Sequence, residues 1–196
     1  ADGTIAIGYF AGSLITSGAR NLAIGYQAMD SLTQGDDNIA IGYSALGAMA
    51  AADNNNKNIA IGNYALDAAG ASSNVAAQNV AVGYDAGGAV TTGDDNVMVG
   101  HQAGDNVTTG NQNVCIGYQA DPSAVGAAGQ IVIGAGTVGQ GDNTAEIGNA
   151  DVTDAYFGGT GQAKAHAGSM IISSSTAVIG SSTASLAIHG SGSEVV

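Results

Sequence analysis

A short motif recurs nine times along the chain, and this repeat constrains the fold more than any other feature of the sequence. Each copy contains an aliphatic triplet followed by a glycine, here called the anchor glycine. Most copies begin with Asn and continue with Tyr-x-Ala. Successive anchor glycines are 17, 17, 20, 21, 17, 17, 17 and 14 residues apart. A regular period of this length is typical of stacked repeats that bury their apolar residues against one another. The anchor glycines are Gly8, Gly25, Gly42, Gly62, Gly83, Gly100, Gly117, Gly134 and Gly148.

The aliphatic triplets predict strands, because they are short, rich in β-branched residues and flanked by turn residues. Clusters such as Thr-Gly-Asp-Asp at 92–95 lie between the triplets, and Gly, Asn and Asp favour tight turns. One strand and one turn region in about 17 residues predict one coil of a parallel β-solenoid or β-roll, whose rungs stack about 4.8 Å apart. We therefore predict an all-β chain. Residues 1–150 would form nine rungs, and residues 151–196 a short irregular β region that serves as a cap or subunit-docking segment.

Side-chain alternation within each strand predicts two faces. Ile39, Ile41 and Tyr43 share one face, whereas Ala40 and Gly42 share the other. We expect the large aliphatic side chains to form the inside of the coil. The other face lacks the polar residues that a water-facing strand would carry, and small residues let the backbone of another chain approach closely.

The face of small residues therefore predicts a parallel homo-oligomer, most simply a trimer. The alternative is a monomeric solenoid with a dry face of Ala and Gly. If the small residues do form the interface, glutamate in place of Ala40 and Ala60 would dissociate the oligomer. The residues expected at this interface are Ala6, Ala23, Ala40, Ala60, Ala81, Met98, Cys115, Gly25, Gly42, Gly62, Gly83, Gly100 and Gly117.

Two further columns of residues follow the same period. The asparagines that open the motif could stack and bond along the axis, as in cross-β structures, or simply mark the junction of turn and strand. The aromatic residues that follow the anchor glycines supply packing area, or a carbohydrate-stacking stripe if they are exposed. The columns are Asn21, Asn38, Asn58, Asn79, Asn96 and Asn113, and Tyr9, Tyr26, Tyr43, Tyr84 and Tyr118, with Tyr64 displaced by one position and His101 in the sixth rung.

The composition excludes several classes of partner. The net charge is −13 and the only cations are Arg20, Lys57 and Lys164, so we expect no nucleic-acid surface, which needs clustered basic residues. No apolar run reaches the roughly 18 residues of a membrane span, so we expect no membrane insertion. The acidity is typical of a soluble, exposed fibre. Aromatic residues make up only 5% of the chain and Trp is absent, which favours a thin core over a thick globular one.

No set of residues in the sequence has the pattern of a catalytic site, and we expect no enzymatic activity. The only glutamates are Glu146 and Glu194. His101, His166 and His189 have no partner at the spacing of a zinc site. Cys115 stands where other rungs have Ala, which predicts a buried structural thiol rather than a nucleophile.

The acidic turns could hold calcium between rungs, because carboxylate and carbonyl oxygens are the ligands that Ca²⁺ prefers. The candidates are Asp36, Asp37, Asp94, Asp95 and Asp142. The nonapeptide repeat of calcium-binding β-rolls is absent. We therefore expect no obligatory cofactor, and calcium is the alternative.

The ends of the stack predict a joint between subunits. Solenoids normally carry a polar cap over each terminal rung, and no such element precedes Ile5 and Ile7 in this sequence. Two apolar segments of the tail could cover the first rung of the next copy, and contacts of this head-to-tail kind generate filaments. The tail residues expected at this joint are Met170, Ile171, Ile172, Val178 and Ile179.

The rungs that read Asn-(Ile/Val)-Ala-(Ile/Val)-Gly-Tyr-x-Ala resemble the head repeats of trimeric autotransporter adhesins. With turns such as Thr-Thr-Gly-Asp-Asp-Asn at 91–96, they are also similar to repeats of phage tail fibres. The resemblance covers residues 3–150, although most rungs are longer than those of the adhesin heads. It implies a trimeric, left-handed parallel β-roll that is displayed outside a cell or on a virion.

These features lead to three hypotheses for the function. The first is a structural subunit of an extracellular or virion fibre that self-assembles through stacked rungs and an inter-chain face. The alternative is the head of a trimeric adhesin that binds a cell-surface or glycan receptor, and a third is a calcium-loaded module of a secreted protein. The rungs are uniform and lack an aromatic-rich tip, which favours the structural fibre.

Overall fold

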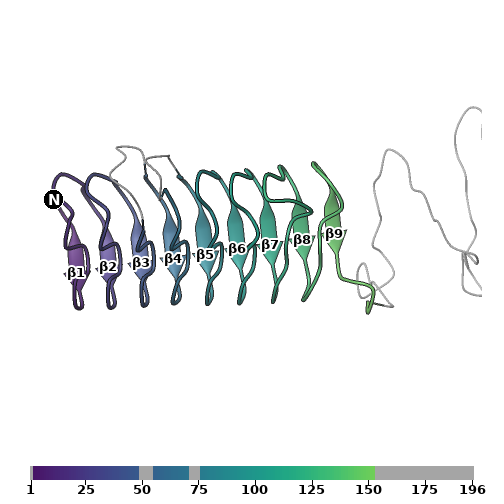
Figure 1. The fold of residues 1–196 in the computed structure, drawn as a ribbon, viewed down its shortest axis with the longest axis horizontal. Helices are drawn as coiled ribbons and strands as arrows, with labels where there is room; N and C mark the ends of the chain where they lie inside the picture. Colours follow the sequence, from purple (N-terminus) through teal and green to yellow (C-terminus); the bar gives the residue numbers. More distant parts are fainter. Residues whose placement is uncertain (1, 49–54, 71–75, 153–196) are drawn as a thin grey trace, which may run out of the picture. The chain divides into compact units, whose positions relative to one another are not determined.

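A computed structural model describes residues 2–48, 55–70 and 76–152, and these lie in the first of two compact units, Ala1–Thr153 and Asp154–Val196. Nine strands form one parallel sheet, in which each strand lies beside the one before it in the chain (Figure 1). The strands are β1 (Ile5–Ile7), β2 (Leu22–Ile24), β3 (Ile39–Ile41), β4 (Ile59–Ile61), β5 (Val80–Val82), β6 (Val97–Val99), β7 (Val114–Ile116), β8 (Ile131–Ile133) and β9 (Ala145–Ile147). The predicted parallel β-solenoid is confirmed, and every predicted triplet forms a strand. The predicted tail strands lie outside the described residues.

The register of the sheet follows the repeat from one end to the other. Below, a coil is numbered by the strand with which it begins. Ala23 pairs with Ala40 and Ala40 with Ala60, although the second separation is 20 residues and the first is 17. Backbone bonds such as Ile39 N–H to the Asn58 carbonyl, 2.8 Å, join successive coils. Among the described residues, no helix is long and apolar enough to cross a lipid bilayer.

The two faces of the strands are reversed relative to the prediction. The middle residue of each strand from β2 to β8 is 0% exposed within a single chain, so the column of small residues lines the inside of the coil. The flanking aliphatic residues, such as Ile39 and Ile41, point outward and keep part of their surface exposed. The predicted interface residues Ala23, Ala40, Ala60, Ala81, Met98 and Cys115 therefore lie in the core, and only Ala6, in β1, is exposed.

The size of the coil explains why small residues line the strand side of the core. Large side chains enter the same space from the turns opposite, and Met29, Leu32, Leu46 and Leu66 are all fully buried. Because protein interiors are close-packed, a strand that also carried Ile inward would overfill so thin a core. Met98 is the largest middle residue of any strand, and here the turns compensate. A side chain at either Gly87 or Gly104 would collide with the Met98 thioether.

The anchor glycines allow close contact between successive coils of one chain. Gly42 and Gly83 have φ values of 140° and 141°, a region that is nearly restricted to glycine. A Cβ atom at Gly42 would lie 2.5 Å from the carbonyl oxygen of Gly62 in the next coil. The anchor glycines thus allow successive coils to stack. Each of these glycines meets the next coil of its own chain, and their place at an interface between chains stays a prediction; they are Gly25, Gly42, Gly62, Gly83, Gly100 and Gly117.

The predicted asparagine ladder is confirmed. The Asn38 side chain donates from Nδ2 to Asn21 Oδ1, 3.2 Å, and to the Asn55 carbonyl, 2.8 Å. Its own Oδ1 accepts from the backbone N–H of Asn58, 2.9 Å. The same pattern continues through Asn79, Asn96 and Asn113, each 0% exposed. The ladder is therefore a buried polar column in which each side chain links three coils and leaves few groups unpaired.

Candidate assembly surface

The outward side of the sheet is a continuous apolar surface, here called the aliphatic face. Every strand contributes two residues to it, one on each side of the inward-pointing middle residue. Several are substantially exposed, with Ile61 and Ile116 both at 38% and Ile7 at 59%. A continuous exposed apolar surface on a soluble protein usually marks a binding surface. The aliphatic face consists of Ile5, Ile7, Leu22, Ile24, Ile39, Ile41, Ile59, Ile61, Val80, Val82, Val97, Val99, Val114, Ile116, Ile131, Ile133, Ala145 and Ile147.

A stack of aromatic rings runs along the coils beside the anchor glycines. Tyr26 and Tyr43 are parallel to within 3°, with ring centroids 5.3 Å apart. His101 continues the stack between Tyr84, 5.1 Å away, and Tyr118, 5.5 Å away. The stack is exposed along its edge, with Tyr43 at 40% and Tyr118 at 53%. Tyr64 interrupts the stack, because it meets Tyr43 and Tyr84 edge-on, at 65° and 76°. The carbohydrate-stacking stripe stays a prediction.

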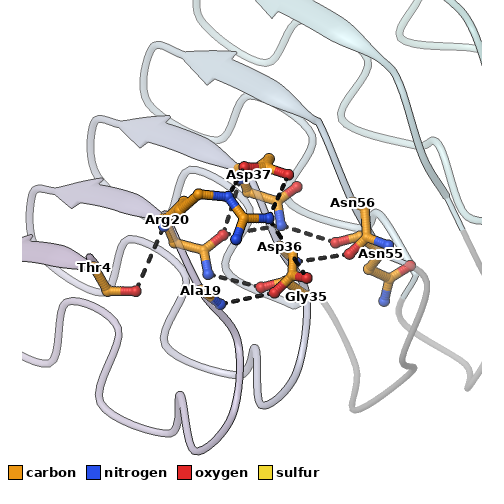
Figure 2. Close-up of polar contacts among 10 residues, drawn as sticks. Thr4, Ala19, Arg20, Gly35, Asp36, Asp37, Asn55 and Asn56 are labelled. Atoms are coloured by element: carbon orange, nitrogen blue, oxygen red, sulfur yellow. Dashed lines mark hydrogen bonds and ion pairs between the residues drawn. The ribbon is translucent and has the colours of Figure 1, made fainter. Parts of the chain in front are cut away.

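The carboxylates predicted as calcium ligands bond to the protein itself. Figure 2 shows Asp36 between Ala19 and Asn56, where its Oδ1 accepts from the Ala19 N–H, 2.7 Å. Asp94 and Asp142 make the same bond to the backbone N–H of residues 77 and 128, at 2.8 and 2.9 Å. Asp95 is exposed. Each of the three bonded carboxylates therefore fastens its turn to the coil before it.

Asp37 is paired with the only arginine of the chain (Figure 2). Arg20 donates from Nε and Nη2 to the two carboxylate oxygens of Asp37, at 2.6 and 2.9 Å. The hydrogen bond from Arg20 and then its positive charge lower the pKa of Asp37. Within the described ranges, no group of three or more His, Cys, Asp or Glu side chains is arranged to hold a metal ion. The calcium hypothesis stays a prediction.

The remaining predicted residues are dispersed. Cys115 is buried in the core, and burial together with the charge of Asp121 raises the pKa of its thiol to about 12, so little reactive thiolate forms at neutral pH. Ile5 and Ile7 of the predicted joint are 55% and 59% exposed on β1. The other half of that joint, Met170, Ile171, Ile172, Val178 and Ile179, lies outside the described residues, as do His166 and His189.

One group of residues was missed in the sequence. Asp67, Asp85, Asp105 and Asp121 occur in four consecutive coils, between two and five residues after the anchor glycine. Their offsets from that glycine differ, so no single column of the repeat marked them. The chain matches no protein-family model, curated protein or solved structure in the comparisons made with it.

Proposed function

We propose that the chain is a structural subunit of an extracellular or virion fibre, in which parallel copies associate through the aliphatic face. The observation that carries this proposal is the uninterrupted apolar surface over nine strands. Its periodicity supports a second copy as the partner, because a matching surface must repeat its apolar groups at the same rung spacing of about 4.8 Å. Two parallel copies in register provide the same contact at every rung.

A trimer is one closed arrangement of this kind. Three copies around one axis turn all three aliphatic faces inward and leave the polar turns in water, whereas the flat faces of an open array would stay partly exposed. The resemblance to trimeric fibre repeats supports the same number of chains. Closed cyclic symmetry is the rule for soluble homo-oligomers. The core from Ala23 to Val132 and the asparagine ladder are buried within one chain, so the proposed trimer joins three folded solenoids.

The ends of the sheet support longer assembly. Within the described residues β1 pairs only with β2, and β9 pairs only with β8. A strand with one unpaired edge can accept another strand, and the joint proposed here brings the segment 168–196 of one subunit onto Ile5 and Ile7 of the next. Such a heterologous contact extends into a filament.

Deletion of residues 168–196 is expected to abolish long filaments and leave the rungs folded. Negative-stain electron microscopy of the full chain should show filaments of uniform width, and the truncated chain short rods only, with an unchanged β signal in circular dichroism. Filaments of the parent length from the truncated chain would show that the tail is not the joint, and compact round particles from the full chain would contradict the fibre itself.

A further inference from the structure

Asp121 occupies a position that lines the core in other coils. It is the fourth residue after its anchor glycine, where coils 3 and 4 have Leu46 and Leu66, both fully buried. The Asp121 N–H donates to the Thr137 carbonyl of the next coil, 3.0 Å. The Leu46 N–H makes the equivalent bond to the Ala65 carbonyl, also 3.0 Å. A carboxyl group therefore stands in coil 7 at the turn position that coils 3 and 4 fill with leucine, whereas the adjacent coils carry Gly104 and the exposed Val138 there.

Three buried polar atoms in coils 6, 7 and 8 have no hydrogen-bond partner. Asp121 Oδ1 is buried without a partner, and so are Asn106 Oδ1 in coil 6 and Thr137 Oγ1 in coil 8. Only Thr33 provides another such atom among the described residues. Carboxylate and amide oxygens can only accept, and an unpaired buried acceptor is unfavourable. Of the three atoms only the Thr137 hydroxyl oxygen can donate, so a proton on Asp121 would supply a second donor.

The charges near Asp121 are all negative except at one exposed histidine. Asp121 belongs to the group of four aspartates that was missed in the sequence, here called the row. The other three, Asp105, Asp85 and Asp67, lie in coils 6, 5 and 4, and the carboxyl groups of all four are partly buried. The charge of Asp85 acts on both Asp67 and Asp105.

The other groups that face Asp121 bring no positive charge to it. Cys115 faces Asp121 from β7, and His101 lies near Asp105. On coil 8, Asp121 bonds to the backbone of Thr137 and Gly139, neither of which titrates. Arg20 and Lys57, the two cations in the described ranges, act on Asp37 instead.

These surroundings favour the protonated carboxyl. Burial, and then the charge of Asp105, raise the pKa of Asp121 to about 6, against the opposing effect of backbone N–H groups at 104–106. Burial followed by the charge of Asp85 also raises the pKa of Asp67 and of Asp105, and at Asp105 the charge of His101 acts in the opposite direction.

We propose that Asp121 is a partly buried, proton-sensitive residue, which tightens the contact between coils 6, 7 and 8 in mildly acidic surroundings and loosens it at neutral pH. A carboxyl group whose pKa is higher in the folded than in the unfolded chain binds its proton more tightly when folded. Stability therefore rises as the pH falls through about 6, and the gain is complete near pH ~4, where the unfolded chain is protonated as well.

The test is thermal unfolding between pH 7.5 and 5 in a His101→Tyr background. This substitution removes the imidazole and introduces the tyrosine that follows the anchor glycine in most of the other coils. The melting temperature of this parent should rise by about 3 °C on acidification. Asp121→Asn supplies a neutral group of the same shape and should raise the melting temperature at pH 7.5 by a similar amount. Its own dependence on pH should be correspondingly smaller.

Asp95→Asn is the matched control, because it removes one exposed carboxylate outside the row. This variant should keep the pH dependence of the parent, which separates Asp121 from the general effect of net charge. In a carboxyl ¹³C NMR titration, Asp121 should titrate near pH 6 and Asp105→Asn should lower that midpoint. An Asp121→Asn variant that melts lower than the parent at pH 7.5, one that keeps the full pH dependence, or a midpoint below about pH 4.5 would overturn the proposal.

Discussion

Glutamate in place of both Ile61 and Ile116 is expected to convert the assembly into folded monomers. Both side chains lie on the aliphatic face with 38% of their surface exposed in one chain, so glutamate at either position can remain in water when the chain is alone. In the proposed trimer the same carboxylates would be buried without partners. Because an unpaired buried charge costs about 3–5 kcal/mol, association should weaken by at least about 1000-fold. Sedimentation equilibrium measures the change, and circular dichroism checks the fold.

Two sets of variants make this result specific to the aliphatic face. Gln78→Glu with Gln112→Glu adds the same charge at exposed turns and should leave the assembly intact. Ala60→Glu places its charge inside the coil, where Ala60 is 0% exposed, and should unfold the chain instead of dissociating it. Dissociation by the turn variants, or an Ala60→Glu chain that stays folded as a monomer, would contradict the assignment of the two faces.

Loss of one rung of the asparagine ladder is expected to destabilise the chain strongly. Asn79→Ala removes the donor to the Gly93 carbonyl, 2.8 Å, and the acceptor for the Asn96 N–H, 3.0 Å. Both remaining groups would be left buried and unpaired, each at about 1–3 kcal/mol. The free energy of unfolding should therefore fall by about 4 kcal/mol, as measured by urea unfolding followed by circular dichroism.

Asn111→Ala is the comparison for the ladder variant. Asn111 is exposed, although its Oδ1 also accepts a backbone hydrogen bond, from Asp94 N–H at 2.7 Å. Water can replace that bond, so the loss should be about 1 kcal/mol. Equal losses for the two variants would show that the buried ladder does not contribute more than an ordinary turn contact.

Periodicity was sufficient to predict the strands and their register. Every triplet marked by an anchor glycine forms a strand, and the insertions that lengthen coils 3 and 4 do not disturb the pairing. Alternation along Ile39, Ala40 and Ile41 also predicted two faces. It did not determine which face is inside, because both are apolar and the answer depends on what enters the coil from the opposite turn.

The residues that decide the orientation lie outside the strands. Met29 and Leu46 follow their anchor glycines by four residues and fill the core across from Ala23 and Ala40. These turn residues adopt left-handed backbone conformations, with φ of 52° and 51°, which are uncommon for side chains of this size. A sequence pattern read only at the strands therefore gave the wrong inside face, and with it the wrong interface. Asp121 was missed for the same reason, since it also belongs to this turn position.

The central claim is that identical residues of the aliphatic face meet between parallel copies. Ile61→Cys, in a Cys115→Ala background that leaves no other thiol, tests it by mild oxidation and non-reducing electrophoresis. If the copies are parallel and in register, cysteines at position 61 of different chains lie together near the axis and should form covalent dimers. Gln78→Cys at an exposed turn should remain monomeric under the same conditions. Monomer alone from Ile61→Cys, or equal cross-linking from both variants, would contradict assembly through the aliphatic face.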